Sequence, residues 1–548
     1  MHALNKDIKI HKIGIDLDNT IICYDLAFQL AARKFRLIDN HVVLPKESLR
    51  NQIRKRKNGE EQWQKLQGYV YGKGILNAEI FPGLYRFLWR CHKNKVKVEI
   101  VSHKTKYGHF DADKTSLRDA SNNFLSDKNI INSSIRLINK ITYTDSLKDK
   151  LNYIKRNNFD WFVDDLVEVA DSILVDGQKS ILFSPGNQIN KLYGNISNSW
   201  EEIENLLFGS LTLDEIKLLS KLLLNGAHVK DVIQLRGRGN SSVYKVLTVK
   251  KPIFFKVYPQ VGKHRRLESE VNSTSVLNNL GMNEIQKTIA FNKELNIAAY
   301  EWIDGDNPQI FDVSTIEKSL HFLQKLHDKR GNHLFDNFSM ASDSCTSAYE
   351  IERQINQRLS QLNDVSDGSE ILFNFLDNEF TPFLKQVIEW SKSQFLISEN
   401  YYKPIEREEM TLSPSDFGFH NILVSKNGGL KFIDFEYFGW DDPVKLASDF
   451  SHHVAMNLTD SMERQWFQGV KDIYGDSILS RLKASWPLYG LNWCLIILNE
   501  FKSDVWVKRC LVNQEIKHNR EDVLLDQLTK SRNKLKYISE CYKDKEFW

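Results

Sequence analysis

Acidic and hydroxyl side chains close three apolar runs near the start of the sequence. Asp16 and Asp18 close the first run, Ser102 closes the second, and Asp164 and Asp165 close the third. Short apolar runs separated by helical patterns are typical of strands in a parallel sheet covered on both faces. We expect the four aspartates to meet beyond the carboxyl ends of these strands. Four carboxylates at one edge repel one another and need a hard cation, for which Mg²⁺ with oxygen ligands is the natural choice.

A second group of polar residues surrounds a predicted hairpin. Asn427 and Gly428 stand between two apolar strands, and Asn-Gly is the strongest signal for a two-residue hairpin turn. That turn sets a register in which Asn421 directly faces Asp434, with their Cβ atoms about 5 Å apart. An amide and a carboxylate so placed are able to share a cation. Asp416 lies just upstream, on the loop that enters the hairpin.

The first group resembles the haloacid dehalogenase-like phosphatase superfamily, through the ordered segments DLDNT, IVSHKT, SLKDK and VDD. The resemblance implies that Asp16 is a nucleophile that forms an aspartyl phosphate, and that Asp18 is the general acid and base. The Mg²⁺ ligands that it implies are Asp16, Asp18, Asp164 and Asp165. The phosphate-binding residues that it implies are Thr20, Ser102 and a lysine. For that lysine we favour Lys148, at the start of its helix, with Lys150 as the alternative.

The second group resembles the aminoglycoside phosphotransferase and choline kinase branch of the protein-kinase-like fold, through EWIDG, FLQKLH and IDFEYFGWDDP. The resemblance implies that Asp416 is the base that orients a substrate hydroxyl, and that Asn421 and Asp434 bind Mg²⁺. The nucleotide-binding residues that it implies are Gly237, Gly239, Lys256, Glu270, Glu301 and Ile303. One residue departs from the pattern: Pro414 stands where this branch usually has a histidine.

The elements that must position these residues form two predicted domains. Residues 1–208 alternate strands with helices, which predicts an α/β, Rossmann-like domain, and the polar helical stretch at about 24–78 predicts a small helical cap. The resemblance implies that this domain is of the haloacid dehalogenase type. Residues 209–548 show a strand-rich part followed by a helical part, and the second resemblance implies an α+β bilobal protein-kinase-like domain. Its strand-rich small lobe is expected at about 225–305 and its large helical lobe at about 306–548.

The composition of the chain limits the kinds of binding partner that we expect. With a net charge of +3 over 548 residues, bulk charge does not favour nucleic acid or a membrane surface as a partner. The six cysteines are scattered, so neither a disulfide framework nor a zinc site is expected. The most apolar stretch, residues 487–501, is too short and too interrupted to cross a bilayer and predicts a buried helix. These features favour a cytoplasmic protein that acts on small molecules.

Together the two groups predict a bifunctional enzyme: an Mg²⁺-dependent phosphatase and an ATP-dependent kinase of a small alcohol. The substrate is expected to be a sugar, polyol or amino alcohol, and the SPSDFGFHN and IVSHKT segments resemble proteins of bacterial surface-polysaccharide pathways. The alternative is a regulatory or scaffold protein that binds nucleotide, with one or both domains inactive. Intact metal ligands in both domains favour the enzyme.

Overall fold

The chain divides into two compact units. The computed structural model describes residues 9–111, 113–132, 135–175, 177–186, 195–235, 241–260, 265–308, 311–366, 368–512 and 519–547. The first unit extends to Leu211, and the second begins at Thr212 and includes nearly all of the remaining chain. Sequence patterning had placed this boundary close by, between residues 208 and 209.

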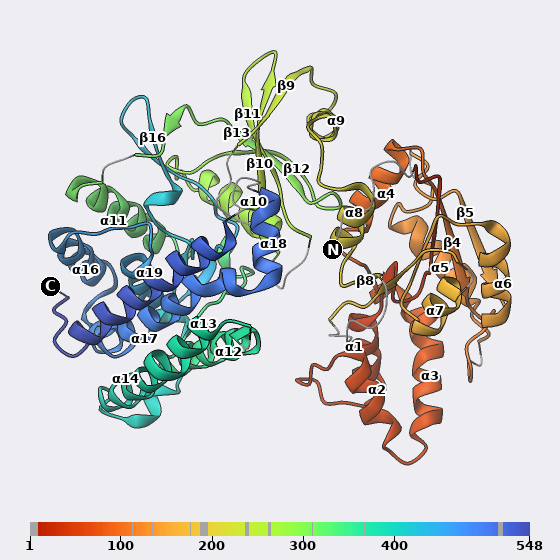
Figure 1. Ribbon diagram of the computed structural model, residues 1–548, viewed down its shortest axis with the longest axis horizontal. Coiled ribbons are helices and arrows are strands. Elements are labelled where there is room, and N and C mark those ends of the chain that lie inside the picture. Colours follow the sequence, from red (N-terminus) through yellow and green to blue (C-terminus); the bar gives the residue numbers. More distant parts are fainter. Residues whose placement is uncertain are drawn as a thin grey trace. The chain divides into compact units, whose positions relative to one another are not determined.

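A six-stranded parallel sheet forms the centre of the first unit (Figure 1). Its order is β5-β4-β1-β6-β7-β8. The strands are β1 (Lys12–Ile15), β4 (Lys97–His103), β5 (Lys140–Thr144), β6 (Trp161–Asp164), β7 (Ser180–Phe183) and β8 (Asn195–Ser197). The three apolar runs predicted β1, β4 and β6, and the apolar segment KSILFSP likewise predicts β7. Strands β5 and β8 were not predicted, because β5 is polar and only partly buried and β8 has three residues.

A helical insertion separates two short antiparallel strands of the same unit, β2 (Ile22–Cys23) and β3 (Glu79–Ile80). It comprises α1 (Asp25–Lys34), α2 (Lys46–Arg54), α3 (Gly59–Tyr71) and the short 3₁₀ helix η1 (Lys73–Asn77). Stacking of Phe28 on Trp63, with ring centroids 5.0 Å apart, joins α1 to α3. The other helices of the unit are α4 (Leu84–Lys93), α5 (Leu117–Asp127), α6 (Leu147–Asn157), α7 (Val167–Val175) and α8 (Trp200–Phe208).

The position of β1 concentrates polar side chains at one edge of the sheet. This strand lies between β4 and β6, and all three run in the same direction. The N–H of Asp16 donates to the carbonyl oxygen of Val163 at 2.9 Å, which fixes the end of β1 beside the end of β6. The strand order changes direction at β1, and such a switch point is where open α/β sheets bind ligands.

An antiparallel sheet with two adjacent helices opens the second unit. Its order is β12-β13-β11-β10-β9. The elements are α9 (Leu213–Leu223), β9 (Val229–Gln234), β10 (Ser242–Thr248), β11 (Pro252–Val257), α10 (Arg266–Asn279), β12 (Thr288–Asn292) and β13 (Ile297–Glu301). Strand β11 lies in the middle of the sheet, and its buried face carries Lys256 toward α10.

Helices dominate the remainder of the second unit (Figure 1). They are α11 (Val313–Asp328), α12 (Ala348–Ser366), α13 (Glu370–Asn374), the π-helical turn η3 (Phe375–Phe380), α14 (Thr381–Ser393), α15 (Pro443–His452), α16 (Asp460–Tyr474), α17 (Leu479–Ile497), α18 (Ser503–Val512) and α19 (Arg520–Cys541). Short strands lie among them: β14 (Gly305–Asp306), β15 (Thr411–Ser413), β16 (Ile422–Ser425), β17 (Leu430–Phe432) and β18 (Gly439–Asp441). The apolar stretch at 487–501 is mostly the buried second half of α17, as expected. Among the described helices, none combines the length and the apolar character that crossing a membrane requires.

The hairpin register expected from Asn427–Gly428 is wrong by one residue. Strands β16 and β17 pair Leu423 with Lys431, so the loop has three residues and Ser425 faces Gly429. Of the two turn residues, Gly428 has positive φ (+76°) and Asn427 does not, so the two-residue turn that needs positive φ at both positions does not form.

The one-residue shift removes the expected pairing of Asn421 with Asp434. The carbonyl oxygen of Asn421 instead accepts the N–H of Ile433 at 3.0 Å. Asp434 follows the ladder with φ +68°, a left-handed conformation that is rare outside glycine and common at functional sites.

Candidate active sites

Three carboxylates and one lysine meet at the sheet edge of the first unit. Carboxylate oxygens of Asp16, Asp164 and Asp165 lie within 4.8 Å of one another. The Nζ of Lys150, on α6, lies 2.6 Å from both Asp16 Oδ1 and Asp164 Oδ2. The geometry favours the alternative, Lys150: Lys148 is exposed on α6, and the lysine that reaches the aspartates is Lys150. Because Ser146 caps the helix, the fourth helical residue is the one that faces the sheet edge.

Electrostatics favours a cation in this cluster. Burial and the neighbouring carboxylates raise the pKa of Asp16 well above its ordinary value, against the effect of Lys150. Burial, followed by the charge of Asp164, raises the pKa of Asp165 to about 7. All donors are oxygen atoms, which suits a hard cation such as Mg²⁺. The arrangement therefore fits the Mg²⁺ that the sequence predicts, with Asp16, Asp164 and Asp165 as the residues able to hold it.

Asp18 lies among side chains that sequence reasoning missed. The hydroxyl of Tyr24 donates to Asp18 Oδ1 at 2.7 Å, and Lys104 Nζ lies 2.7 and 2.9 Å from the two carboxylate oxygens. Asp18 is not part of the carboxylate cluster that could hold a metal. Lys104 stands two residues after Ser102, inside the IVSHKT segment, so its position beside a strand end was the available signal.

The two predicted phosphate-binding hydroxyls are both buried. Ser102 lies near the carboxyl end of β4, the strand that pairs with β1. The Oγ1 of Thr20 is fully buried and has no hydrogen-bond partner among the described residues. The carbonyl oxygen of Thr20 accepts the indole N–H of Trp200 at 3.0 Å, which ties the loop after β1 to α8.

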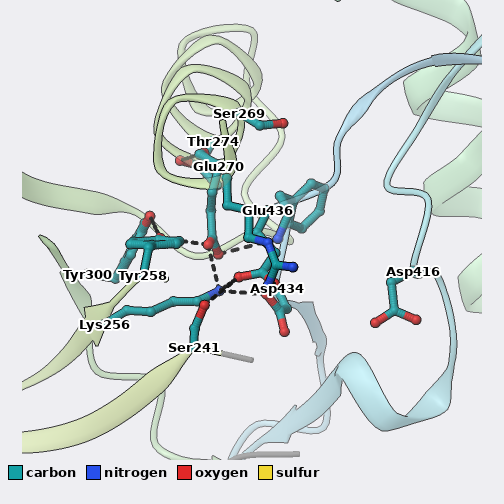
Figure 2. Close-up of polar contacts among 12 residues, drawn as sticks. Ser241, Lys256, Tyr258, Ser269, Glu270, Thr274, Tyr300, Asp416, Asp434 and Glu436 are labelled. Carbon is teal, nitrogen blue, oxygen red and sulfur yellow. Dashed lines mark hydrogen bonds and ion pairs between the residues drawn. The ribbon is translucent and has the colours of Figure 1, made fainter. Parts of the chain in front are cut away.

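A buried lysine joins three acidic residues in the second unit (Figure 2). Lys256 Nζ, on β11, lies 2.7 Å from Glu270 Oε2, 2.6 Å from Asp434 Oδ1 and 3.0 Å from Glu436 Oε2. Glu270 comes from α10, and its Oε2 also accepts the hydroxyl of Tyr258 at 2.6 Å. Lys256 and Glu270, both predicted as nucleotide-binding residues, are therefore paired, while Glu436 was missed although it stands two residues after Asp434.

Burial and neighbouring charges shift the pKa values of residues in this cluster. Burial alone would lower the pKa of Lys256, but Asp434, Glu270 and Glu436 outweigh it and raise that pKa well above its ordinary value. Burial raises the pKa of Asp434 to about 7, against the attraction of Lys256. Arg266 lies 3.0 Å from Glu436 Oε1, so Glu436 is shared by two cations. Oxygens of Glu270, Asp434 and Glu436 lie within 4.8 Å of one another, which fits a divalent cation once Lys256 has another partner.

Asp416 lies apart from this cluster, on a separate segment with no dashed contact to it (Figure 2). His420 Nε2 lies 3.0 Å and His453 Nε2 3.9 Å from Asp416 Oδ1. Asn421 Nδ2 donates to the carbonyl oxygen of Asp416 at 2.9 Å. Burial would raise the pKa of Asp416, but the hydrogen bond from His420 and both imidazoles lower it below the ordinary value. Neither histidine was predicted. His453 is the C-cap residue of α15, a helix that lies well after Asp416 in the sequence.

The predicted nucleotide-binding residues are only partly described. Gly237 and Gly239 lie outside the described residues. The N–H of Glu301 donates to Lys287, and its carbonyl oxygen accepts from Gln286 Nε2 at 2.8 Å, so both groups are already engaged. Ile303 is buried and, within the described chain, has no backbone hydrogen bond of its own. Ile303 thus keeps the free backbone groups that a base-binding hinge needs.

No protein-family model matches the sequence, and no curated protein matches it. Solved structures of small-molecule kinases match part of the chain. A spectinomycin phosphotransferase, APH(9)-Ia, solved with ADP and spectinomycin, is 14% identical, with 61% of this chain and 99% of that chain covered and a TM-score of 0.44. The choline kinase LicA from Streptococcus pneumoniae is 17% identical (59% and 99% covered, TM-score 0.38). An ethanolamine kinase from Plasmodium vivax is 16% identical (56% and 83% covered, TM-score 0.37).

Proposed function

We propose that the protein is a bifunctional enzyme, with an ATP-dependent kinase in the second unit and an Mg²⁺-dependent phosphatase in the first. The kinase would phosphorylate a hydroxyl of a small metabolite such as a sugar, polyol or amino alcohol. The observation that carries the kinase proposal is the buried cluster of Lys256, Glu270 and Asp434, with Asp416 held separately by two histidines. Phosphoryl transfer needs one group of residues that neutralises the charge of the phosphates and another residue that positions the substrate hydroxyl.

Each kinase residue has a role that its contacts support. Glu270 holds Lys256 so that its ammonium group is available to nucleotide phosphates. Asp434, with Asn421 and the newly found Glu436, would hold Mg²⁺, which supplies charge neutralisation on the transferred phosphoryl group. Asp416 is ionised at neutral pH because its pKa is lowered, so it accepts a hydrogen bond from the substrate hydroxyl and orients it. The unpaired backbone of Ile303 would hold the adenine.

Asp434→Asn tests the kinase proposal. We expect ATP turnover to fall by about 10³-fold or more, since a lost metal ligand removes charge neutralisation. Lys256 keeps Glu270 and Glu436, so the melting temperature without ligand should stay level or rise. Stabilisation by Mg²⁺-ATP should vanish, because a ligand stabilises only the state that it binds. The measurements are ATP consumption and thermal melts with and without Mg²⁺-ATP.

The control is Asp526→Asn, which removes an exposed carboxylate from α19. This variant should keep both the activity and the nucleotide-induced shift of the natural protein. An unchanged Mg²⁺-ATP shift in Asp434→Asn would show that Asp434 does not bind the metal.

The phosphatase proposal rests on the cluster of Asp16, Asp164, Asp165 and Lys150. Asp16 lies at the end of the central strand, where its carboxylate is held by Lys150 at 2.6 Å. It would attack phosphorus, and Lys150 and Ser102 would hold the phosphoryl oxygens. Asp18, which receives the Tyr24 hydroxyl, would protonate the leaving oxygen and later activate water. Mg²⁺ held by the three carboxylates would neutralise the phosphoryl charge.

Asp16→Asn tests this second activity. An amide is isosteric with the carboxylate but cannot attack phosphorus, so phosphate release should fall by roughly 10⁴-fold or more. ATP turnover should stay intact, because Asp16 belongs to the first unit. The assay is phosphate release from a panel of phosphomonoesters, with Asp127→Asn, an exposed aspartate at the end of α5, as the matched control. Phosphate release that persists in Asp16→Asn would show that Asp16 is not the nucleophile.

A regulatory or scaffold protein that binds nucleotide without chemistry is the competing function. It predicts nucleotide-induced stabilisation together with no ATP consumption in a metabolite screen and no phosphate release. The carboxylate clusters of both units favour the enzyme, because a protein that never handles a divalent cation gains nothing from burying them.

A further inference from the structure

We propose that the phosphatase site acts on phosphomonoesters whose leaving group carries a second negative charge, and that Lys46 of the helical insertion binds that charge. The inference rests on the proposed phosphatase function and adds a substrate class to it. The site would then prefer a phosphorylated acid or a bisphosphate to the phosphate of a neutral alcohol.

Lys46 begins α2 and extends toward the loop after β1. Its Nζ donates to Asn19 Oδ1 at 2.6 Å, and the hydroxyl of Tyr71 lies 3.5 Å away. The ammonium group lies 5.1 Å from the ring centroid of Phe28 and 5.9 Å from that of Tyr71. Asn19 stands between Asp18 and Thr20 and has φ +60°, so the sequence places Lys46 beside the residue that would protonate the leaving group.

The charge on Lys46 has no carboxylate partner. Its contacts are an amide oxygen, a phenol and two rings, and no carboxylate among the described residues lies within the 4.0 Å of an ion pair. The other two lysines of this site differ: Lys104 pairs with Asp18, and Lys150 pairs with Asp16 and Asp164. Burial lowers the pKa of Lys46, and the nearby charges of Asp165 and Asp18 act against that effect.

A count of formal charges around the site shows which positive charge has no negative partner. Asp16, Asp164 and Asp165 face one lysine, Lys150, which leaves two negative charges for one divalent cation. On the side of Asp18, Lys104 already balances the carboxylate. Lys46 then remains as a partly desolvated positive charge with only neutral partners. An ammonium group in that state gains most from an anion, because burying an unpaired charge is costly.

Lys46 lies on the side of the site where the leaving group would bind, and not on the side of the phosphoryl group. Lys46 contacts Asn19, the residue next to Asp18, whereas Asp16 and Asp164 are the partners of Lys150. Tyr71, whose pKa burial raises, stays protonated beside it. Lys46 with this hydroxyl group suits a carboxylate or phosphate better than a neutral polyol.

The test compares 3-phosphoglycerate with glycerol 3-phosphate, which differ by a carboxylate in place of a hydroxymethyl group. In the natural protein with Mg²⁺, kcat/KM should be at least about tenfold higher for 3-phosphoglycerate, as expected for one charged hydrogen bond. Lys46→Met keeps the aliphatic stem over Phe28 and Tyr71 and should abolish the preference. Lys46→Arg should restore it in part. Lys34→Met is the matched control, since Lys34 also meets a tyrosine hydroxyl and ring, those of Tyr69, and its loss should leave the preference unchanged.

Equal losses on both substrates in Lys46→Met would overturn the inference, because Lys46 would then serve the phosphoryl group itself. Equal use of both substrates by the natural protein would overturn it as well. If the natural protein hydrolyses no phosphomonoester, the proposed phosphatase function fails. Calorimetric binding of the two probes to Asp16→Asn, with and without Lys46→Met, then decides the charge preference without turnover.

Discussion

Two histidines hold the carboxylate that would orient the kinase substrate. The rings of His420 and His453 are stacked, with centroids 4.1 Å apart and planes 5° from parallel. The N–H of Ala455 donates to His453 Nδ1 at 3.1 Å, so neutral His453 carries its proton on Nε2, which faces Asp416. Burial lowers the pKa of His453 to about 4, which keeps it neutral. Asp416 thus faces two N–H groups, one at hydrogen-bond distance from His420 and one farther away on His453.

We expect His453→Leu to lower kcat for ATP-dependent phosphorylation by roughly tenfold, the effect of one contact to a charged group. KM for ATP should change little, because His453 contacts Asp416 and not the cluster around Lys256. His453→Gln, which keeps an N–H donor, should recover most of the activity. Steady-state kinetics of both variants measures this. A His453→Leu enzyme with normal kcat, or one that His453→Gln fails to rescue, would contradict the positioning role.

The sequence indicated which residue types form the sites, but not every contact. Asp16, Asp164 and Asp165 were predicted together because they follow strands of one parallel sheet, and the structure places them together. Lys150 was ranked behind Lys148 because the choice depends on where the helix begins, and helix ends are uncertain by a residue or more from sequence alone. His453 was missed because it comes from a distant helix, and no local pattern links it to Asp416.

At the scale of elements, the hairpin shows how a strong local signal fails. Asn-Gly favours a two-residue turn, yet a three-residue loop with one left-handed glycine is the next most common solution, and this chain adopts it. The pairing of Ser425 with Gly429 moves every later pair by one residue. Such a shift exchanges the faces of the strand. Asp434 still reaches Lys256 because it lies beyond the ladder, where its φ of +68° redirects the chain.

Strands and helices with a continuous apolar pattern were predictable, and short edge strands were not. Strands β1, β6 and β7 are buried almost throughout and mostly apolar, and β4 has a buried centre of apolar residues, which is the pattern that indicated them. Helix α8 carries Ser199 as its N-cap, an ordinary start signal. Strand β5 reads KITYT, with one buried residue, which no periodicity distinguishes from a loop.

At the scale of the whole molecule, each unit buries a cluster of carboxylates with one member whose pKa is raised to about 7. In the first unit this member is Asp165, and in the second it is Asp434. Buried like charges destabilise a fold unless something neutralises them, and here protons and a divalent cation are the two candidates. The two units therefore share one physical dependence on pH and Mg²⁺, although they would carry out different reactions.

The stabilisation of the protein by Mg²⁺ should therefore increase with pH and then level off. Without metal, the folded pKa values of Asp165 and Asp434 lie above the unfolded value, so the folded state binds more protons between about pH 4 and pH 7. Its free energy of unfolding falls as pH rises through that range. Mg²⁺ competes with those protons, so the difference in melting temperature with and without Mg²⁺ should grow from about pH 5 to about pH 7.5 and stay constant above. Asp165→Asn and Asp434→Asn should each remove part of this growth, and the double variant should remove more than either, because the two residues belong to separate units and their effects should add. Asp16, whose pKa is also raised, should retain the remainder. Thermal melts across pH, with Ca²⁺-free buffers and a chelator-treated sample as the metal-free reference, measure the effect. A Mg²⁺-induced shift that is already maximal at about pH 5 would mean that neither carboxylate holds a proton in competition with the metal.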